Sequence, residues 1–282
     1  MWILKCITLE GLKSFLLCFY GLRKMHRLQY VENLYMTPTR PMPLLSKICP
    51  SLRFYIHLIS IVVRSSRVAK KGSYSDENWI ESSFAVLQRL EQAGVKIEIS
   101  GIENIKGQKG PVVFIGNHMS MMETMILPVI IQPILPVTFV VKESLLAYPF
   151  FKHIMRSRNP VAVSRTNARQ DLKVVMTDGV EKLKAGVSII VFPQTTRSHS
   201  FDPQQMSSIG VKLAKKAGVP AIPLALKTDC WQNGTWIKDF GRLDRSKTAF
   251  YNFGSPITIA GKGDEEQEII NDFIVSALKR WG

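Results

Sequence analysis

Short apolar runs alternate with longer amphipathic stretches from residue 95 to the end of the chain. Runs of four to six apolar residues indicate buried strands, whereas apolar residues at three- and four-residue spacing indicate helices. Strands that alternate with helices are typical of an α/β fold with a mostly parallel central sheet and helices on both faces. The expected strands cover residues 95–99, 112–115, 137–141, 161–163, 187–192, 221–226, 249–253 and 257–259. Helices are expected from residue 75 to 93, after His118 to about residue 129, through residues 149–151, and over 172–185, 208–217 and 264–279.

Several polar residues follow the ends of these expected strands. His118, Arg165 and Arg197 each lie just beyond an apolar run, and Lys142 ends another. Ligands of such sheets bind at the carboxyl ends of the strands. The sequence therefore predicts a histidine base and several cations at one rim, where guanidinium groups hold a phosphate or carboxylate.

His118 and Glu123 are separated by five positions. On a regular helix this spacing places the two side chains about 140° apart. They meet only if His118 lies in a turn and Glu123 lies in the first turn of the following helix. The carboxylate then fixes the imidazole tautomer and leaves the other nitrogen free to act as a base. The alternative is a histidine that caps the helix beside a solvated glutamate.

The sequence offers no enzyme nucleophile for such a base to activate. It contains no G-x-S-x-G elbow, and none of its cysteines lies in a pattern typical of a nucleophile. We therefore expect the histidine to activate a substrate hydroxyl directly. His118 and Glu123 alone are too few ligands for a metal ion, so no metal site is expected.

The formal net charge of +15 implies an acidic partner, either nucleic acid, anionic lipid or a phosphorylated substrate. The sequence has no RRM-like aromatic pair, KH-type glycine loop or zinc-finger spacing, which argues against nucleic acid. The four cysteines are scattered without a C-x-x-C pair and indicate neither a zinc site nor a disulfide framework. Reduced thiols fit the cytoplasmic side of a membrane.

Residues 1–72 differ in character from the α/β domain expected over residues 73–282. Residues 1–22 have mostly helical apolar spacing, and a second apolar stretch at 44–63 precedes Arg64, Arg67, Lys70 and Lys71. The apolar core at 54–63 is about half the length of a membrane-spanning helix. Apolar helices flanked by basic residues lie in the headgroup region of anionic membranes. We expect membrane association at the cytoplasmic face, the alternative being helices packed on the domain as core.

Four sequence blocks between about residues 95 and 260 resemble those of the 1-acylglycerol-3-phosphate acyltransferase family, in the family's order. Residues 117–123 are similar to the N-H-x4-D box, and residues 142–165 are similar to the second block, which ends in an arginine. Residues 192–198 resemble F-P-E-G-T-R-S, and residues 219–225 resemble the last block, V-P-i-i-P-v-a.

The resemblance implies that His118 is the general base, that Glu123 orients it, and that the hydroxyl of a lysophospholipid attacks the thioester of acyl-CoA or acyl carrier protein. It implies no cofactor, because the acyl donor is a substrate. Arg165 and Arg197 would hold the acceptor's phosphate. The other implied substrate-binding residues are Asn117, Lys142, Gln194, Thr195 and Thr196. Backbone amides near residues 194–196 would stabilise the oxyanion.

Three residues depart from the family's pattern: Glu123 replaces Asp, Gln194 replaces Glu and Thr195 replaces Gly. Glu123 retains the anion that orients the histidine, and the other two changes are expected to alter acceptor recognition. The function expected first is an O-acyltransferase that converts 1-acylglycerol-3-phosphate to phosphatidic acid. The alternatives are acylation of another lyso-lipid and a catalytically silent, membrane-bound homologue.

Overall fold

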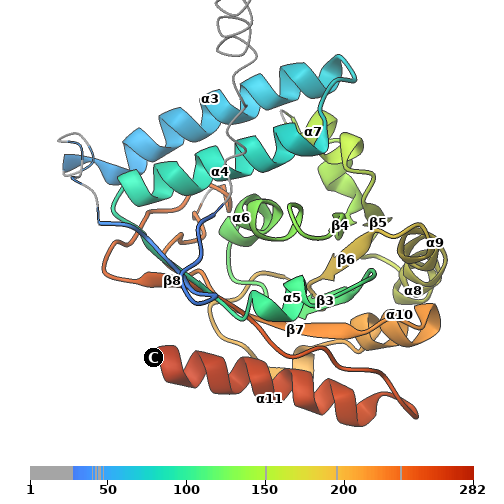
Figure 1. Ribbon diagram of the computed structural model, residues 1–282. Coiled ribbons are helices and arrows are strands. Elements are labelled where there is room, and N and C mark those ends of the chain that lie inside the picture. Colours follow the sequence, from blue (N-terminus) through green and yellow to red (C-terminus); the bar gives the residue numbers. More distant parts are fainter. Residues whose placement is uncertain are drawn as a thin grey trace, which may run out of the picture.

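The computed structural model describes residues 28–39, 41, 43, 46, 48–149, 151–194, 196–235 and 237–282. Its centre is an eight-stranded sheet with the order β1-β2-β8-β7-β3-β6-β4-β5 (Figure 1). Neighbouring strands are parallel except in the pairs β1–β2 and β7–β8. The strands are β1 Tyr35–Met36, β2 Lys96–Ser100, β3 Val113–Gly116, β4 Val137–Lys142, β5 Val161–Val163, β6 Ser188–Val191, β7 Ala221–Lys227 and β8 Thr248–Phe253. The mostly parallel sheet predicted from the sequence is confirmed.

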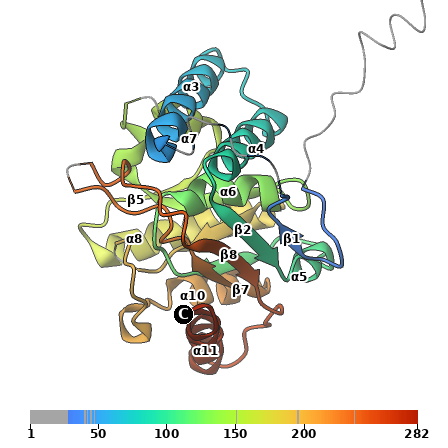
Figure 2. The same cartoon turned by 90° about the vertical axis from the view of Figure 1, so that its left-hand side faces the viewer.

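Helices cover both faces of the sheet, as predicted. The first layer contains α3 (Pro50–Lys70), α4 (Asp76–Gln92), α6 (Met122–Ile131) and α7 (Lys152–Ser157). The opposite layer contains α8 (Ala168–Val174), α9 (Val180–Lys184), α10 (Ile209–Ala217) and α11 (Asp264–Trp281). The short helix α5 (Glu103–Lys106) follows β2. Figures 1 and 2 show α3 above the sheet and α11 below it.

The central strand β3 contributes to both hydrophobic cores. Phe114 belongs to the core under α3, α4 and α6, whereas Val113 and Ile115 belong to the core formed with α10 and α11. Successive side chains of a strand point to opposite faces, so a central strand covered on both sides is apolar at every position. This explains why the apolar run that forms β3 is continuous, whereas burial alternates along β2 and β8.

Helix α3 begins with Pro50 in its first turn and has Arg67 and Lys70 in its last, both favourable placements for a helix. It buries Phe54, Leu58 and Val62 and packs against α4 and α7. Part of the second apolar stretch is therefore core, as the alternative interpretation required. Among the described residues, no helix is long and apolar enough to cross a membrane. The amphipathic helix predicted over residues 1–22 lies outside the described residues.

Three local predictions differ in detail from the structure. The helix expected through residues 149–151 is a 3-10 turn at Glu143–Leu146 followed by α7, because Pro149 cannot donate a backbone hydrogen bond to continue a helix. The strand expected at 257–259 is a single bridge between Ile257 and Ala221. The helix expected over 172–185 is interrupted between α8 and α9 by a π-helical turn at Val175–Gly179.

Candidate active site

The turn that carries His118 is fixed by its neighbour strand β7. At Gly116 a Cβ atom would lie 2.8 Å from the carbonyl oxygen of Leu224, so the close approach of β3 and β7 requires glycine there. The Asn117 side chain then donates to the Leu226 carbonyl at 2.7 Å and accepts from its N–H at 2.8 Å. This buried amide continues the sheet pairing one residue beyond the strand and so positions His118.

His118 and Glu123 meet in the geometry that their spacing requires. Helix α6 begins at Met122, so Glu123 lies in its first turn and His118 lies in the preceding turn. The Nδ1 atom of His118 is 2.6 Å from Oε2 of Glu123. An ionised carboxylate only accepts hydrogen bonds, so Nδ1 carries the proton and Nε2 is the nitrogen left for a substrate proton.

The Glu123 carboxylate is fully buried and is surrounded by donors. The N–H groups of Met119 and Ser120 each donate to Oε1 at 2.9 Å. The Thr228 hydroxyl also donates to Oε1 and in turn accepts from Ser120 Oγ at 2.9 Å. A helix N-terminus with free N–H groups stabilises a negative charge. These contacts compensate the burial of the charge and fix the carboxylate that orients His118.

Two further contacts hold His118 from other directions. Its ring stacks on Phe192, with centroids 4.5 Å apart and the planes 5° from parallel. Its backbone N–H donates to Oε1 of Gln194 at 2.6 Å. The Gln194 side chain is buried, so in this structure it contacts the backbone of His118. A glutamate would offer the same acceptor, and the Gln194 departure from the family's pattern therefore preserves this bond.

The two arginines follow β5 and β6, the two strands that flank β4 in the sheet. Arg165 follows β5 with a φ of 60°, an uncommon backbone conformation for a non-glycine residue. The Asp171 carboxylate holds this turn by accepting from the N–H groups of Ser164 and Arg165, both at 2.8 Å. Burial, and secondly the nearby Arg197 guanidinium, lower the pKa of Arg165. Arg197 also donates to Asp239 at 2.6 Å.

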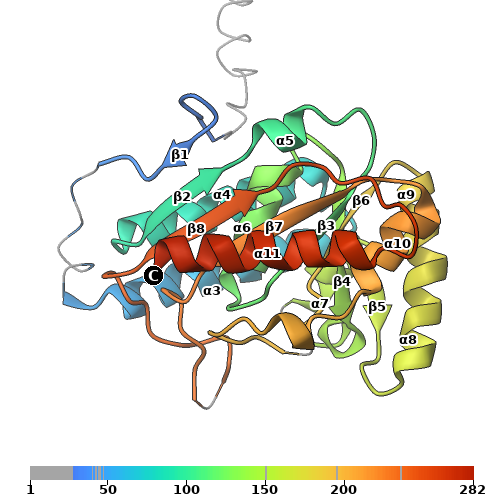
Figure 3. The same ribbon diagram turned by 90° about the horizontal axis from the view of Figure 1, so that it is seen from below.

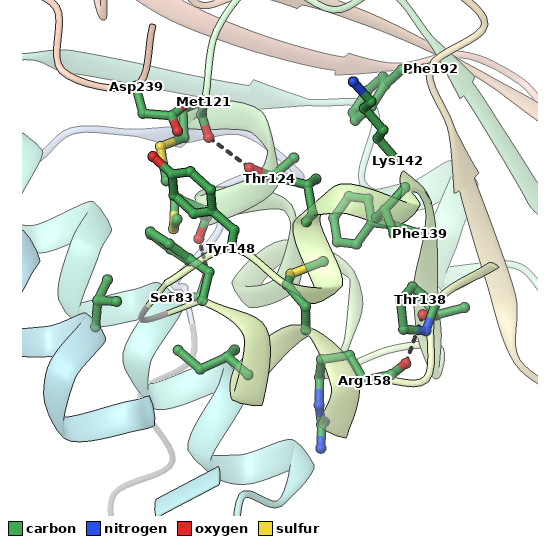
Figure 4. A pocket seen from close by; sticks show the side chains of 18 of the residues that line it. Ser83, Met121, Thr124, Thr138, Phe139, Lys142, Tyr148, Arg158, Phe192 and Asp239 are labelled. Atoms are coloured by element: carbon green, nitrogen blue, oxygen red, sulfur yellow. Dashed lines mark hydrogen bonds between the residues drawn. The ribbon is translucent and has the colours of Figure 1, made fainter. Parts of the chain in front are cut away.

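An apolar cavity of about 580 Å³ leads away from His118 between the sheet and the first helix layer. Besides His118, its polar lining and the ring stacked on His118 come from Lys142, Arg165, Phe192, Thr196, Arg197, Lys238 and Asp239. Its walls come from apolar side chains of α3, α4, α6, β4 and α7, among them Ile61, Val86, Met125, Phe139 and Met155. Figure 4 places Phe192, Lys142 and Asp239 toward one end and Arg158 toward the other. Arg158 there pairs with Asp76 at 2.6 Å.

Comparison with known proteins identifies the family. A family model described as Acyltransferase matches residues 96–227. A 1-acyl-sn-glycerol-3-phosphate acyltransferase of Borreliella burgdorferi is 30% identical over 192 residues, which cover 66% of this chain and 73% of that protein. The chain belongs to the 1-acyl-sn-glycerol-3-phosphate acyltransferase family.

Two further proteins are similar to this chain. The Pseudomonas aeruginosa protein of the same name is 32% identical over 168 residues, 59% of this chain and 63% of that relative, so the matched part spans somewhat less than two thirds of its length. A crystal structure of the 1-acyl-sn-glycerophosphate (LPA) acyltransferase PlsC from Thermotoga maritima matches with a TM-score of 0.57 at 21% identity. The match covers 82% of this chain and 94% of that one, and it shows a shared fold.

The residues that the family resemblance singled out take different places around the cavity. His118, Lys142, Arg165, Thr196 and Arg197 line it. Asn117, Glu123 and Gln194 are buried, and their side-chain oxygens accept hydrogen bonds from the protein. Thr195 lies outside the described residues.

Sequence reasoning missed Thr228, Asp171 and Asp239. Thr228 directly follows the end of β7, so the strand-end argument that found His118 would have reached it as well. Asp171 and Asp239 lie in a helix and a loop, and their roles depend on contacts that the local sequence does not encode.

Proposed function

We propose that this family member transfers a fatty acyl group from acyl-CoA or acyl carrier protein to the hydroxyl of 1-acylglycerol-3-phosphate, and so makes phosphatidic acid. The observation that carries the proposal is the His118–Glu123 pair beside an apolar cavity that Arg165 and Arg197 also line. A base, an anion site and an apolar tunnel are what a phosphorylated lipid acceptor and a fatty acyl donor need together.

In this mechanism Nε2 of His118 removes the proton from the acceptor hydroxyl as its oxygen attacks the thioester carbonyl carbon. Glu123 stabilises the imidazolium that forms. The tetrahedral intermediate collapses with cleavage of the C–S bond, and the imidazolium returns the proton to the leaving thiolate. Arg165 and Arg197 bind the phosphate and hold the hydroxyl beside His118. The fatty acyl chain occupies the apolar cavity. Asn117 and Gln194 position the histidine backbone.

We further propose that the outer face of α3 lies on the anionic cytoplasmic surface of a membrane. Leu52, Ile56 and Ile59 are exposed bulky residues on this helix. Their spacing, continued by Arg67 and Lys70, places them along one side, opposite the buried Phe54 and Leu58. An apolar stripe followed by basic residues is typical of helices that lie in the headgroup region. The 1-acylglycerol-3-phosphate in the membrane would then lie next to the protein.

The test is acyl transfer by the purified full chain to 1-acylglycerol-3-phosphate, with product detected by mass spectrometry. His118→Ala should abolish transfer while circular dichroism and vesicle binding stay as in the wild type. Retained turnover would refute the mechanism. A matched panel of lyso-lipids with phosphomonoester and zwitterionic headgroups tests the acceptor, because two guanidiniums favour the more negative group. Preference for a zwitterionic acceptor would support another lyso-lipid substrate, and no turnover with any acceptor would support a silent homologue.

A further inference from the structure

Residues 231–235 and 237–243 form a hairpin loop, here called the 231–243 hairpin, whose Lys238 and Asp239 line the cavity. Trp231 and Leu243 form a bridge at its base, and the Gln232 N–H donates to the Arg242 carbonyl at 3.1 Å. Any side chain at Gly241 would collide with the Gln232 backbone, so the closed shape requires glycine. Figures 2 and 3 show this orange segment standing out from the body of the molecule. These contacts fix the shape of the hairpin.

The 231–243 hairpin exposes two bulky apolar side chains next to residues that line the cavity. Ile237 is 54% exposed and Phe240 is 43% exposed. Between them, Lys238 and Asp239 line the cavity, and Asp239 pairs with Arg197. Exposed apolar side chains grouped at the entrance to a site indicate an interaction surface.

The hairpin is also fastened to α3. The Tyr55 hydroxyl donates to the Gly241 carbonyl, and the Tyr55 and Phe240 rings lie 5.1 Å apart. At the base of the hairpin, the Phe54 and Trp231 rings pack edge to face at 4.9 Å, and the Leu243 N–H donates to Ser51 Oγ at 3.0 Å. Tyr55 neighbours Leu52, Ile56 and Ile59 on the helix surface, so the apolar surface of α3 continues onto the hairpin.

We propose that the 231–243 hairpin is a second contact with the anionic bilayer, and that Ile237 and Phe240 insert at the boundary between headgroups and acyl chains. Lys238 then lies at headgroup level, where its charge complements an anionic surface. This contact holds the cavity mouth against the membrane, so a lyso-lipid enters without its chain crossing water. The proposal rests on the proposed function and on the docking of α3.

The experiment compares two isoleucines of equal exposure on opposite sides of the protein. Ile237→Glu changes the hairpin, and Ile269→Glu changes α11, where Ile269 is 53% exposed. Full-length variants are floated with vesicles of phosphatidylglycerol and phosphatidylcholine. The bound fraction gives the partition coefficient of the protein between membrane and water. We expect Ile237→Glu to reduce this partition coefficient about tenfold and Ile269→Glu to leave it unchanged. Equal binding by the two variants would overturn the proposal.

An activity assay separates membrane contact from a direct role in the reaction. Ile237→Glu should lose about tenfold in rate on 1-acylglycerol-3-phosphate presented in vesicles and keep the wild-type kcat/KM on a short-chain, monomeric analogue. Equal losses on both substrates would overturn the proposal, because the hairpin would then act on catalysis. A wild-type protein that is dimeric without vesicles, and that becomes monomeric on Ile237→Glu, would also overturn the proposal. The hairpin would then bind a second copy of the chain instead of the membrane. The flotation result stands even if the wild-type chain transfers no acyl group.

Discussion

Replacing Glu123 by glutamine tests the histidine–carboxylate pair with almost no change of shape. All groups around the carboxylate are donors: the Met119 and Ser120 N–H groups, the Thr228 hydroxyl and Nδ1 of His118. Glutamine must place its NH₂ group against one set of them. Facing the backbone N–H groups and Thr228, the NH₂ group loses three hydrogen bonds. Facing His118, it loses the bond from Nδ1 and the longer branch of the Ser120 N–H at 3.2 Å, while Ser120 keeps its bond to Oε1, so this orientation is favoured.

In the favoured orientation the amide donates to Nδ1, which must become an acceptor. The imidazole proton then moves to Nε2, and the nitrogen that faces the substrate can no longer take a proton. Loss of the orienting carboxylate of a catalytic triad lowers kcat by about 10⁴-fold, which corresponds to about 5.5 kcal/mol. We expect a loss of this order, together with about 1.5–3 kcal/mol of stability from the missing charge-assisted bond.

The assay is kcat for acyl transfer by Glu123→Gln, with thermal unfolding measured on the same protein. Glu123→Asp is the matched control because it keeps the charge while shortening the side chain by one methylene group. It should retain more activity than the amide, since the wrong tautomer is not favoured. A Glu123→Gln enzyme within tenfold of the wild type, or one more active than Glu123→Asp, would refute the assigned role of the carboxylate.

Three other perturbations follow from the same contacts. Thr228→Val removes a hydrogen-bond donor to Glu123 and should lower kcat about tenfold with an unchanged KM. The control Thr228→Ser should retain most of the activity. A Thr228→Val enzyme with the wild-type kcat would show that the hydroxyl does not position the carboxylate. Asp239→Asn weakens the ion pair with Arg197, which leaves the guanidinium more available to the substrate phosphate. The KM for 1-acylglycerol-3-phosphate should therefore fall severalfold. A higher KM would mean that Asp239 holds Arg197 in its binding position. Burial raises the pKa of the Cys230 thiol to about 12, so the thiolate is scarce at pH 8. Iodoacetamide should label exposed Cys49 and spare Cys230 in the folded protein, and peptide mass spectrometry showing equal labelling would contradict the buried assignment.

The sequence was informative about the rim because parallel strands end at one edge. His118 and Arg165 follow two strands and Lys142 ends a third, and the rim of the sheet places all of them at one cavity. The spacing of His118 and Glu123 also set a geometric condition that the turn before α6 meets. These conclusions need only the order of strands and the position of each residue relative to its strand end.

The sequence was less informative about which polar side chains turn inward. Asn117 and Gln194 satisfy backbone groups of Leu226 and His118, and buried backbone groups without such partners are costly. Which groups need partners depends on the register of β3 against β7 and on the path of a distant loop. Thr228 contacts Glu123 across 105 positions for the same reason. Such contacts are set by the completed sheet and are absent from any local pattern.

The unequal filling of the two layers has a consequence for how this protein can vary. The first layer is hollowed by the cavity, whereas Val113, Ile115 and Leu213 pack into a separate hydrophobic core on the opposite face. A side chain such as Met125 can therefore change in size to suit a longer or shorter fatty acid without disturbing that second core. The sheet separates the cavity from the second core, so a substitution in the cavity leaves the packing of the second core, and the part of the folding stability that this core supplies, unchanged.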